Sequence, residues 1–149
     1  MTSASSLPTV SLPLTALYSG AVGVLFALLS LRAFLYRGSK GAKAYFGDQN
    51  IPAAPKLQSI VRAQGNLAEY YGAFFVLFAV LEFNKVVGST TLNGLGICFF
   101  LARLSHALYM FSPDSIPPIP FRAFGFVGSF APIAIASFYN VVYGFHNKY

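Results

Sequence analysis

Charged residues are scarce in this sequence. Only 9% of its 149 residues are charged and 56% are hydrophobic, whereas soluble domains have roughly 25% charged residues. The mean hydropathy is +0.61. This composition excludes an ordinary soluble domain and predicts an integral membrane protein. The length suits one domain, here taken as residues 1–149.

Cysteine and acidic residues are also few. The single cysteine, Cys98, lies in an apolar run, so the chain cannot form an internal disulfide. A small buried hydrophobic side chain is its simplest interpretation. Cysteine and histidine show no spacing typical of a metal site. The net charge is +6, but the basic residues form no patch with interleaved aromatic residues, so nucleic acid is not an expected partner.

Four long apolar segments predict four transmembrane helices, at about residues 13–36, 56–85, 91–110 and 121–145. Each is long enough to span, because about 20 residues cross the hydrocarbon core. No basic region precedes the first segment, which is therefore not a standard cleaved signal peptide. Helices with these connections predict an all-α, up-down-up-down membrane bundle.

Basic residues are divided unequally between the two ends of the predicted bundle. Lys85 and Lys148 fall at one end, where Glu82 and Lys85 are expected to close the second helix as solvated residues. The positive-inside rule places the other, more basic end in the cytoplasm and both termini on the opposite side. The basic residues at that end are Arg32, Arg37, Lys40, Lys43, Lys56, Arg62, Arg103 and Arg122.

The polar first turns of the second predicted helix carry a cation, an amide and a carboxylate on one face. At about 100° per residue, Arg62, Asn66 and Glu69 project at roughly 0°, 40° and −20°, and Tyr70 borders this stripe. Such a column can hold a zwitterionic ligand, with Arg62 on a carboxylate and Glu69 on an ammonium group. The structural alternative is a self-satisfied polar patch inside a helix bundle.

The same stretch resembles a family signature. Residues 62–70 fit the pattern Arg-Ala-Gln-x-Asn-x-x-Glu-Tyr, which is similar to the second-helix motif of MAPEG proteins, the membrane-associated proteins in eicosanoid and glutathione metabolism. The family often has Pro where this chain has Gly72, and Glu where it has Gln58. The resemblance implies a glutathione site that includes Arg62, Asn66, Glu69 and Tyr70.

Two further stretches resemble the same family. Residues 102–107 contain the Arg-x-x-His motif of its third helix, here Arg103 and His106, which the resemblance places at the glutathione site. Residues 120–125 read Pro-Phe-Arg-x-x-Gly and resemble the start of its fourth helix. The resemblance implies that Arg122 lies near the glutathione sulfur and is the catalytic residue. A structural hydrogen-bonding role is the alternative for an intramembrane histidine.

Two more residues are expected at the glutathione site, each with a structural alternative. Arg32 matches an arginine that family members place at the end of the first helix. The alternative is an arginine whose side chain snorkels to the membrane surface. Several members have a ligand-contacting tyrosine seven residues after the third-helix arginine, but that residue here is Met110. Tyr109 comes one position early, rotated by about 100°, and a tyrosine at the membrane interface is equally compatible.

The cluster of charged groups indicates a function, because each charge at a transmembrane helix centre costs roughly 2.5–3.5 kcal/mol. The excess of arginine suits an anionic ligand and would favour the thiolate form of a bound thiol. The resemblance implies a glutathione S-transferase-like enzyme of detoxification or eicosanoid metabolism, assembled as a homotrimer with sites between subunits. Its other substrate would be a lipophilic electrophile, or a lipid hydroperoxide if it also acts as a peroxidase.

The alternative function is a non-catalytic lipid-binding or scaffold protein of the same superfamily. A transporter has little support, because the sequence has no internal repeat and no pair of broken helices. A bacterial inner membrane and the endoplasmic reticulum are both compatible with the sequence, with the site facing the cytoplasm.

Overall fold

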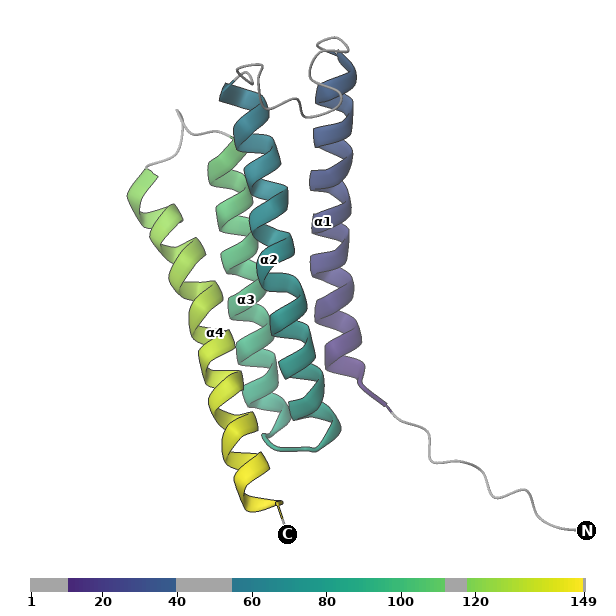
Figure 1. Ribbon diagram of the computed structural model, residues 1–149, viewed down its shortest axis with the longest axis vertical. Helices are drawn as coiled ribbons and strands as arrows, with labels where there is room; N and C mark the ends of the chain where they lie inside the picture. Colours follow the sequence, from purple (N-terminus) through teal and green to yellow (C-terminus); the bar gives the residue numbers. More distant parts are fainter. Residues whose placement is uncertain (1–10, 40–54, 112–117, 149) are drawn as a thin grey trace, which may run out of the picture.

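The computed structural model describes residues 11–39, 55–111 and 118–148, and these ranges contain four helices and no strand. Each helix begins and ends within one turn of its predicted bounds. Lys40 and Lys43, on which the predicted orientation partly depends, lie outside the described residues. The helices are α1 (Pro13–Ser39), α2 (Pro55–Phe83), α3 (Ser89–Phe111) and α4 (Pro118–His146) (Figure 1).

All four helices have the length and composition of membrane spans. Their apolar windows have hydropathies of 1.9, 1.3, 1.2 and 1.5 in chain order. Large hydrophobic side chains are exposed on every helix, including Leu28, Val76, Ile97 and Phe138. An exposed apolar surface of this extent could be covered by membrane lipid or by a partner subunit. The predicted four-helix membrane fold is therefore confirmed.

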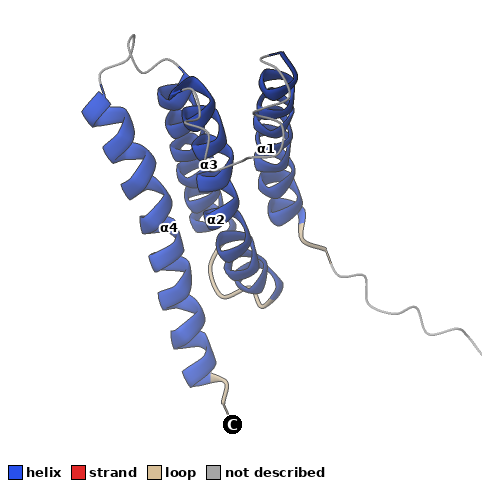
Figure 2. Ribbon diagram, turned by 45° about the horizontal axis from the view of Figure 1, so that its top comes forward, coloured by secondary structure: helices blue, strands red, loops and turns tan. Residues whose placement is uncertain are grey.

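The helices alternate in direction along the chain. The ends of α1 and α3 and the starts of α2 and α4 lie together at the upper end of Figure 1, and the start of α1 and the end of α4 lie toward the lower end. α1 packs against α2 and α3, and α4 packs against α2 and α3 from the other side (Figures 1 and 2). Among the described residues, α1 and α4 do not contact each other.

Aromatic packing joins α2 to α3 in the middle of the bundle. The rings of Phe74 and Phe99 stack with centroids 4.0 Å apart and planes 9° from parallel. Phe74 and Phe78 are both fully buried, and their centroids lie 5.3 Å apart. This buried cluster holds the two central helices together, so that α1 and α4 can each pack on them.

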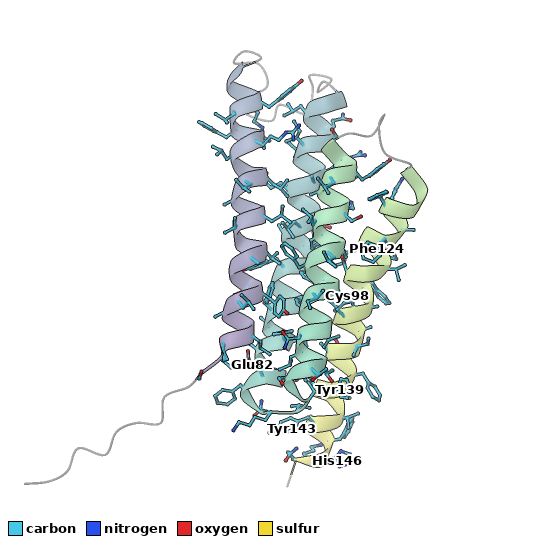
Figure 3. All side chains as sticks on the ribbon, turned by 180° about the vertical axis from the view of Figure 1, so that it is seen from behind. Glu82, Cys98, Phe124, Tyr139, Tyr143 and His146 are labelled. Atoms are coloured by element: carbon cyan, nitrogen blue, oxygen red, sulfur yellow. The ribbon has the colours of Figure 1, made fainter. Side chains whose placement is uncertain are left out.

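Polar groups near the lower end join helices to one another. The Glu82 carboxylate, labelled in Figure 3, accepts hydrogen bonds from the backbone N–H of Leu14 at 2.8 Å and of Thr15 at 2.7 Å. These N–H groups belong to the first turn of α1, which has no intrahelical partner for them. The expectation that Glu82 is a solvated helix end is therefore wrong, because the carboxylate caps a neighbouring helix. Lys85 is exposed, as expected.

Small residues bring α3 and α4 into close contact toward the upper end. A Cβ atom added to Gly125 would lie 2.9 Å from Cβ of His106, and one added to Gly128 would lie 2.8 Å from Cβ of Ala102. Both distances are shorter than atoms of this size tolerate. The two glycines therefore let α4 approach the part of α3 that carries Arg103 and His106.

Candidate functional site

A cavity of about 480 Å³ opens among α2, α3 and α4 toward the upper end of the bundle. Its volume lies within the roughly 300–1,000 Å³ that is usual for small-molecule sites. Its polar and charged lining comprises Arg62, Asn66, Glu69, Tyr70, Arg103, His106 and Arg122. The remaining lining comprises Val61, Gly65, Met110 and Phe126.

Helical periodicity explains how the side chains from α2 and α3 reach the same cavity. On α2, Arg62, Asn66 and Glu69 are spaced i, i+4 and i+7, which is the stripe predicted from the sequence. On α3, Arg103 and His106 are spaced i and i+3, and Met110 completes that stripe at i+7. Two adjacent helices therefore present matching stripes to one space.

The start of α4 supplies the third wall of the cavity. Arg122 and Phe126 are spaced i and i+4, so they lie one above the other on one side of this helix. Arg122 comes in the second turn of α4, and Phe126 lies one turn farther along the span. The cavity wall thus changes from cationic to aromatic along α4.

Arg103 is the buried anchor of the site. Its side chain is 3% exposed, and its Nη1 donates to Oδ1 of Asn66 at 2.7 Å. Its Nη2 donates to the backbone carbonyl of Gly125. Its Cζ also lies 4.8 Å from the centroid of the Tyr70 ring, a cation–π contact. Arg103 therefore connects α3 to both α2 and α4.

Three charged residues form the accessible part of the cavity. The side chains of Arg62, Glu69 and Arg122 are all exposed, whereas Asn66 and His106 are half-buried. The full lining has three arginines and one glutamate, an excess of cationic groups that favours an anionic ligand. A ligand with both acidic and basic groups could contact both signs of charge.

Two residues predicted for the site do not line this cavity. Arg32 is half-buried on α1, which packs on the side of α2 and α3 away from α4. Tyr109 is half-buried on α3, but Met110 next to it lines the cavity instead. The helix keeps a regular register through this point, so the rotation of about 100° between neighbours separates the two side chains.

Four lining residues were not predicted from the sequence. Met110 and Phe126 could have been found from their spacing, because they lie at i+7 from Arg103 and i+4 from Arg122. Val61 and Gly65 carry no chemical signal of their own. Their place in the lining became evident only when the packing of α2 against α3 and α4 was known.

Four apolar, membrane-length helices, three of which line a polar cavity, define an integral membrane protein of the helical-bundle class. The sequence matches the model of the MAPEG family over residues 15–142. The chain therefore belongs to the MAPEG family, the superfamily of glutathione and eicosanoid metabolism, and the resemblance seen in its motifs is confirmed. Searches of curated proteins and of solved structures found no match.

The matched range contains every residue that lines the cavity. It extends from the first turn of α1 into the last turns of α4. The family includes glutathione transferases and related enzymes as well as non-catalytic members. Membership thus defines the fold and the superfamily, and the choice between these activities depends on the chemistry of the cavity.

Proposed function

We propose that this protein is an integral membrane glutathione transferase that activates glutathione as a thiolate and joins it to lipophilic electrophiles. The observation that carries this proposal is that Arg62, Asn66, Glu69 and Arg122 line the same cavity. A structural polar patch would be expected to pair its charges internally, as Glu82 does. Arg62, Glu69 and Arg122 instead present exposed charged side chains to the cavity.

Glutathione has chemical groups that complement these residues. It carries two carboxylates, one ammonium group and one thiol. Arg62 would bind a carboxylate through its guanidinium fork, and Glu69 would bind the ammonium group. Asn66, Tyr70 and His106 would complete the binding surface, and Arg103 would support it from α3. The net positive lining would attract the peptide, whose net charge is negative at neutral pH.

Arg122 would stabilise the reacting sulfur. A thiolate is the nucleophilic form of a thiol, and a nearby guanidinium group favours it over the thiol. The sulfur would attack an electrophilic carbon of the second substrate, forming a carbon–sulfur bond as the leaving group departs with the displaced electron pair. The thiol proton would be released to solvent through the exposed mouth of the cavity.

A peroxidase reaction would use the same thiolate. Its sulfur would attack one oxygen of a lipid hydroperoxide, and the O–O bond would break to release an alkoxide that is protonated to the lipid alcohol. A second glutathione would then reduce the sulfenic acid formed on the first, giving glutathione disulfide and water. The peroxide is reduced, and two thiols are oxidised.

The apolar part of the lining would receive the lipophilic substrate. Met110 and Phe126 line the cavity beside Arg122, and the Phe126 side chain is exposed. Phe130 follows one turn later on α4, and the two rings are nearly parallel with centroids 6.2 Å apart. A substrate dissolved in membrane lipid could reach the sulfur along this aromatic surface.

We also propose a homotrimer with its sites between subunits and with the cavity facing the cytoplasm. The exposed hydrophobic side chains of α4, including Phe126, Phe130 and Phe138, would pack against a neighbouring subunit or lipid. In such an assembly Arg32 would approach the site of a neighbour. The predicted orientation depends on the basic residues at the upper end and on the positive-inside rule.

A matched pair of variants on α2 tests the proposal. Glu69→Gln should weaken glutathione binding by at least about tenfold, because it removes the partner of the ammonium group. Glu82→Gln removes the same charge from the lower end and should leave the affinity unchanged while lowering the thermal midpoint. Affinity is measured by isothermal titration calorimetry in detergent, with transfer activity measured on an aryl halide and on a lipid hydroperoxide.

The results distinguish an enzyme from the lipid-binding alternative. Binding and conjugation by the wild type, with selective loss in Glu69→Gln, would support the transferase. If the folded wild type does not bind glutathione, the transferase proposal is wrong. The exposed aromatic surface of α4 would then favour a non-catalytic lipid-binding member of the family.

A further inference from the structure

Arg103 differs from the other two arginines of the cavity in how it is held. Arg62 and Arg122 are exposed, whereas Arg103 is 3% exposed and donates hydrogen bonds to two other helices. Because a guanidinium group can donate but cannot accept hydrogen bonds, Arg103 requires an oxygen at each of these contacts. Oδ1 of Asn66 supplies one of them, at 2.7 Å.

This requirement determines the orientation of the Asn66 carboxamide. An asparagine side chain carries one acceptor oxygen and one donor NH₂ group, which diverge from the same carbon. With the oxygen held by Arg103, the NH₂ group is directed away from the guanidinium. Asn66 is half-buried and lines the cavity. The side chain can therefore offer a ligand a donor, and its acceptor is already engaged.

We propose that Arg103 is a positioning residue, which holds the Asn66 amide so that its NH₂ group donates to an oxygen acceptor of the ligand. The inference rests on the proposed function, in which the ligand is glutathione, and adds the chemistry recognised at this point. The acceptor would be a carboxylate or peptide carbonyl oxygen. An ammonium or amide N–H group of a ligand would be rejected here, because it would face the NH₂ group of Asn66 and both groups are hydrogen-bond donors.

Arg103 is restrained on three sides. The Nη1 atom also lies 3.4 Å from the backbone carbonyl oxygen of Asn66, and the Tyr70 ring packs against the guanidinium. The Gly125 carbonyl is within reach of Nη2 because α4 approaches α3 closely at this glycine. Nε is buried and has no hydrogen-bond partner among the described residues. Because a guanidinium carries five N–H groups, these contacts leave the N–H of Nε and the second N–H of Nη2 for a direct contact between Arg103 and a ligand.

The first experiment needs no ligand and compares two substitutions of Asn66. Asn66→Asp keeps an acceptor for Arg103 and should leave the thermal midpoint in detergent close to that of wild type. Asn66→Leu has a similar size but no acceptor, so it leaves a buried donor unpaired and should lower the midpoint. If both variants unfold at the same temperature, the Arg103–Asn66 bond does not hold the site and the proposal is overturned.

Asn140 on α4 provides a control with the opposite hydrogen-bond polarity. Its Nδ2 donates to the backbone carbonyls of Leu77 and Ala136, at 3.1 and 3.0 Å. Asn140→Asp replaces that donor by an acceptor facing carbonyl oxygens, and it should lower the thermal midpoint. The same chemical change is therefore expected to be tolerated at Asn66 and harmful at Asn140, because the two amides have opposite orientations.

The second experiment measures glutathione binding to the same proteins. Asn66→Asp should lower the affinity by about tenfold or more although it folds, because an acceptor then faces the ligand's oxygen. In Asn140→Asp, binding per folded molecule should be unchanged. An unchanged affinity in Asn66→Asp would show that the NH₂ group does not donate to the ligand, which would overturn the proposal.

A double-mutant cycle separates positioning from direct contact. Arg103→Lys keeps the charge but replaces the guanidinium fork by a single ammonium group. It should weaken binding in the wild-type background and cause no further loss in an Asn66→Ala background, because Arg103 acts through Asn66. Additive losses would mean that Arg103 contacts the ligand itself. If the wild type does not bind glutathione, the proposed function fails, and the thermal comparison still decides whether Arg103 orients Asn66.

Discussion

The two ends of the bundle use polar side chains in opposite ways. Near the lower end the Tyr18 hydroxyl donates to Asn93 at 2.7 Å, the Tyr143 hydroxyl donates to Asn84 at 3.1 Å, and Glu82 caps α1. Toward the upper end, Arg62, Glu69 and Arg122 have exposed side chains around one cavity. A polar residue within a membrane helix is therefore not by itself a sign of a ligand site.

The environments of the two glutamates of α2 illustrate this difference. Glu69 and Glu82 lie on the same helix, and the sequence alone predicted a ligand contact for the first and a solvated position for the second. Glu82 is in fact half-buried and joined to two backbone amides, whereas Glu69 is exposed at the cavity. We infer that Glu82 serves to hold the helices together and that Glu69 keeps its carboxylate available to a ligand.

The largest expected effect comes from removing the cation that faces the proposed thiolate. Arg122→Ala should slow glutathione conjugation roughly 100- to 1,000-fold, the usual cost of removing one group that stabilises developing negative charge. Arg122→Lys should recover part of the rate, because an ammonium group retains the charge but lacks the guanidinium fork. The rate is measured under saturating glutathione, and thiolate is measured by its ultraviolet absorbance.

Lys148→Ala is the control for that measurement, because it removes a positive charge that is exposed at the lower end. Its rate and thiolate absorbance should equal those of wild type. If Arg122→Ala also retains wild-type absorbance, the two ends do not differ in the way proposed, and Arg122 has no role in activating the thiol.

A smaller effect, on the free energy of unfolding, is expected from a substitution that disturbs the packing of the lower half of the bundle. A Cβ atom added to Gly96 on α3 would overlap the ring of Tyr18 on α1. Gly96→Ala should therefore lower the free energy of unfolding by about 1–3 kcal/mol, as overpacking of a closed core does. Gly94→Ala on the same helix is the control, because in the part of the chain that the structure describes nothing lies within 4 Å of its Cβ position. Equal thermal midpoints for both variants would contradict the tight contact between α1 and α3.

The smallest effect concerns two glycines of α2 that both face open space. No atom of the described residues lies within 4 Å of a Cβ added to Gly65 or Gly72, so either change to Ala should stabilise the helix by roughly 0.5–1 kcal/mol. Gly65 lines the cavity and Gly72 does not. Gly65→Ala should therefore weaken glutathione binding severalfold, whereas Gly72→Ala should not. Equal affinities in calorimetry would show that the ligand does not approach α2 at Gly65.

Much of the candidate site follows from helical spacing in the sequence. Arg62, Asn66 and Glu69 were predicted on one face of α2, and all three line the cavity. Arg103 and His106 were predicted on one face of α3, and they line the same cavity. This succeeded because a regular helix converts sequence separation directly into direction. The roles of these residues in binding and catalysis stay predictions.

Relations between helices could not be predicted in this way. The placement of Arg32 depends on which helices flank α1, and α1 packs against α2 and α3 without contacting α4 among the described residues. The cap that Glu82 provides joins residues 67 and 68 positions apart in the chain. No local pattern encodes such a pairing, because it depends on how two separate helices lie along each other.

The sequence by itself determined that this is a four-helix membrane protein of the MAPEG family, and it determined which faces of α2 and α3 carry the polar groups of the cavity. Hydropathy, length and periodicity are local properties, and the bilayer enforces them because every spanning backbone must satisfy its own hydrogen bonds. Only the tertiary structure decided that Arg103 is buried against Asn66 and Gly125 while Arg62 and Arg122 remain accessible. The physical reason is that burial and hydrogen-bond partnership depend on how closely separate helices pack, and glycines such as Gly125 set that distance.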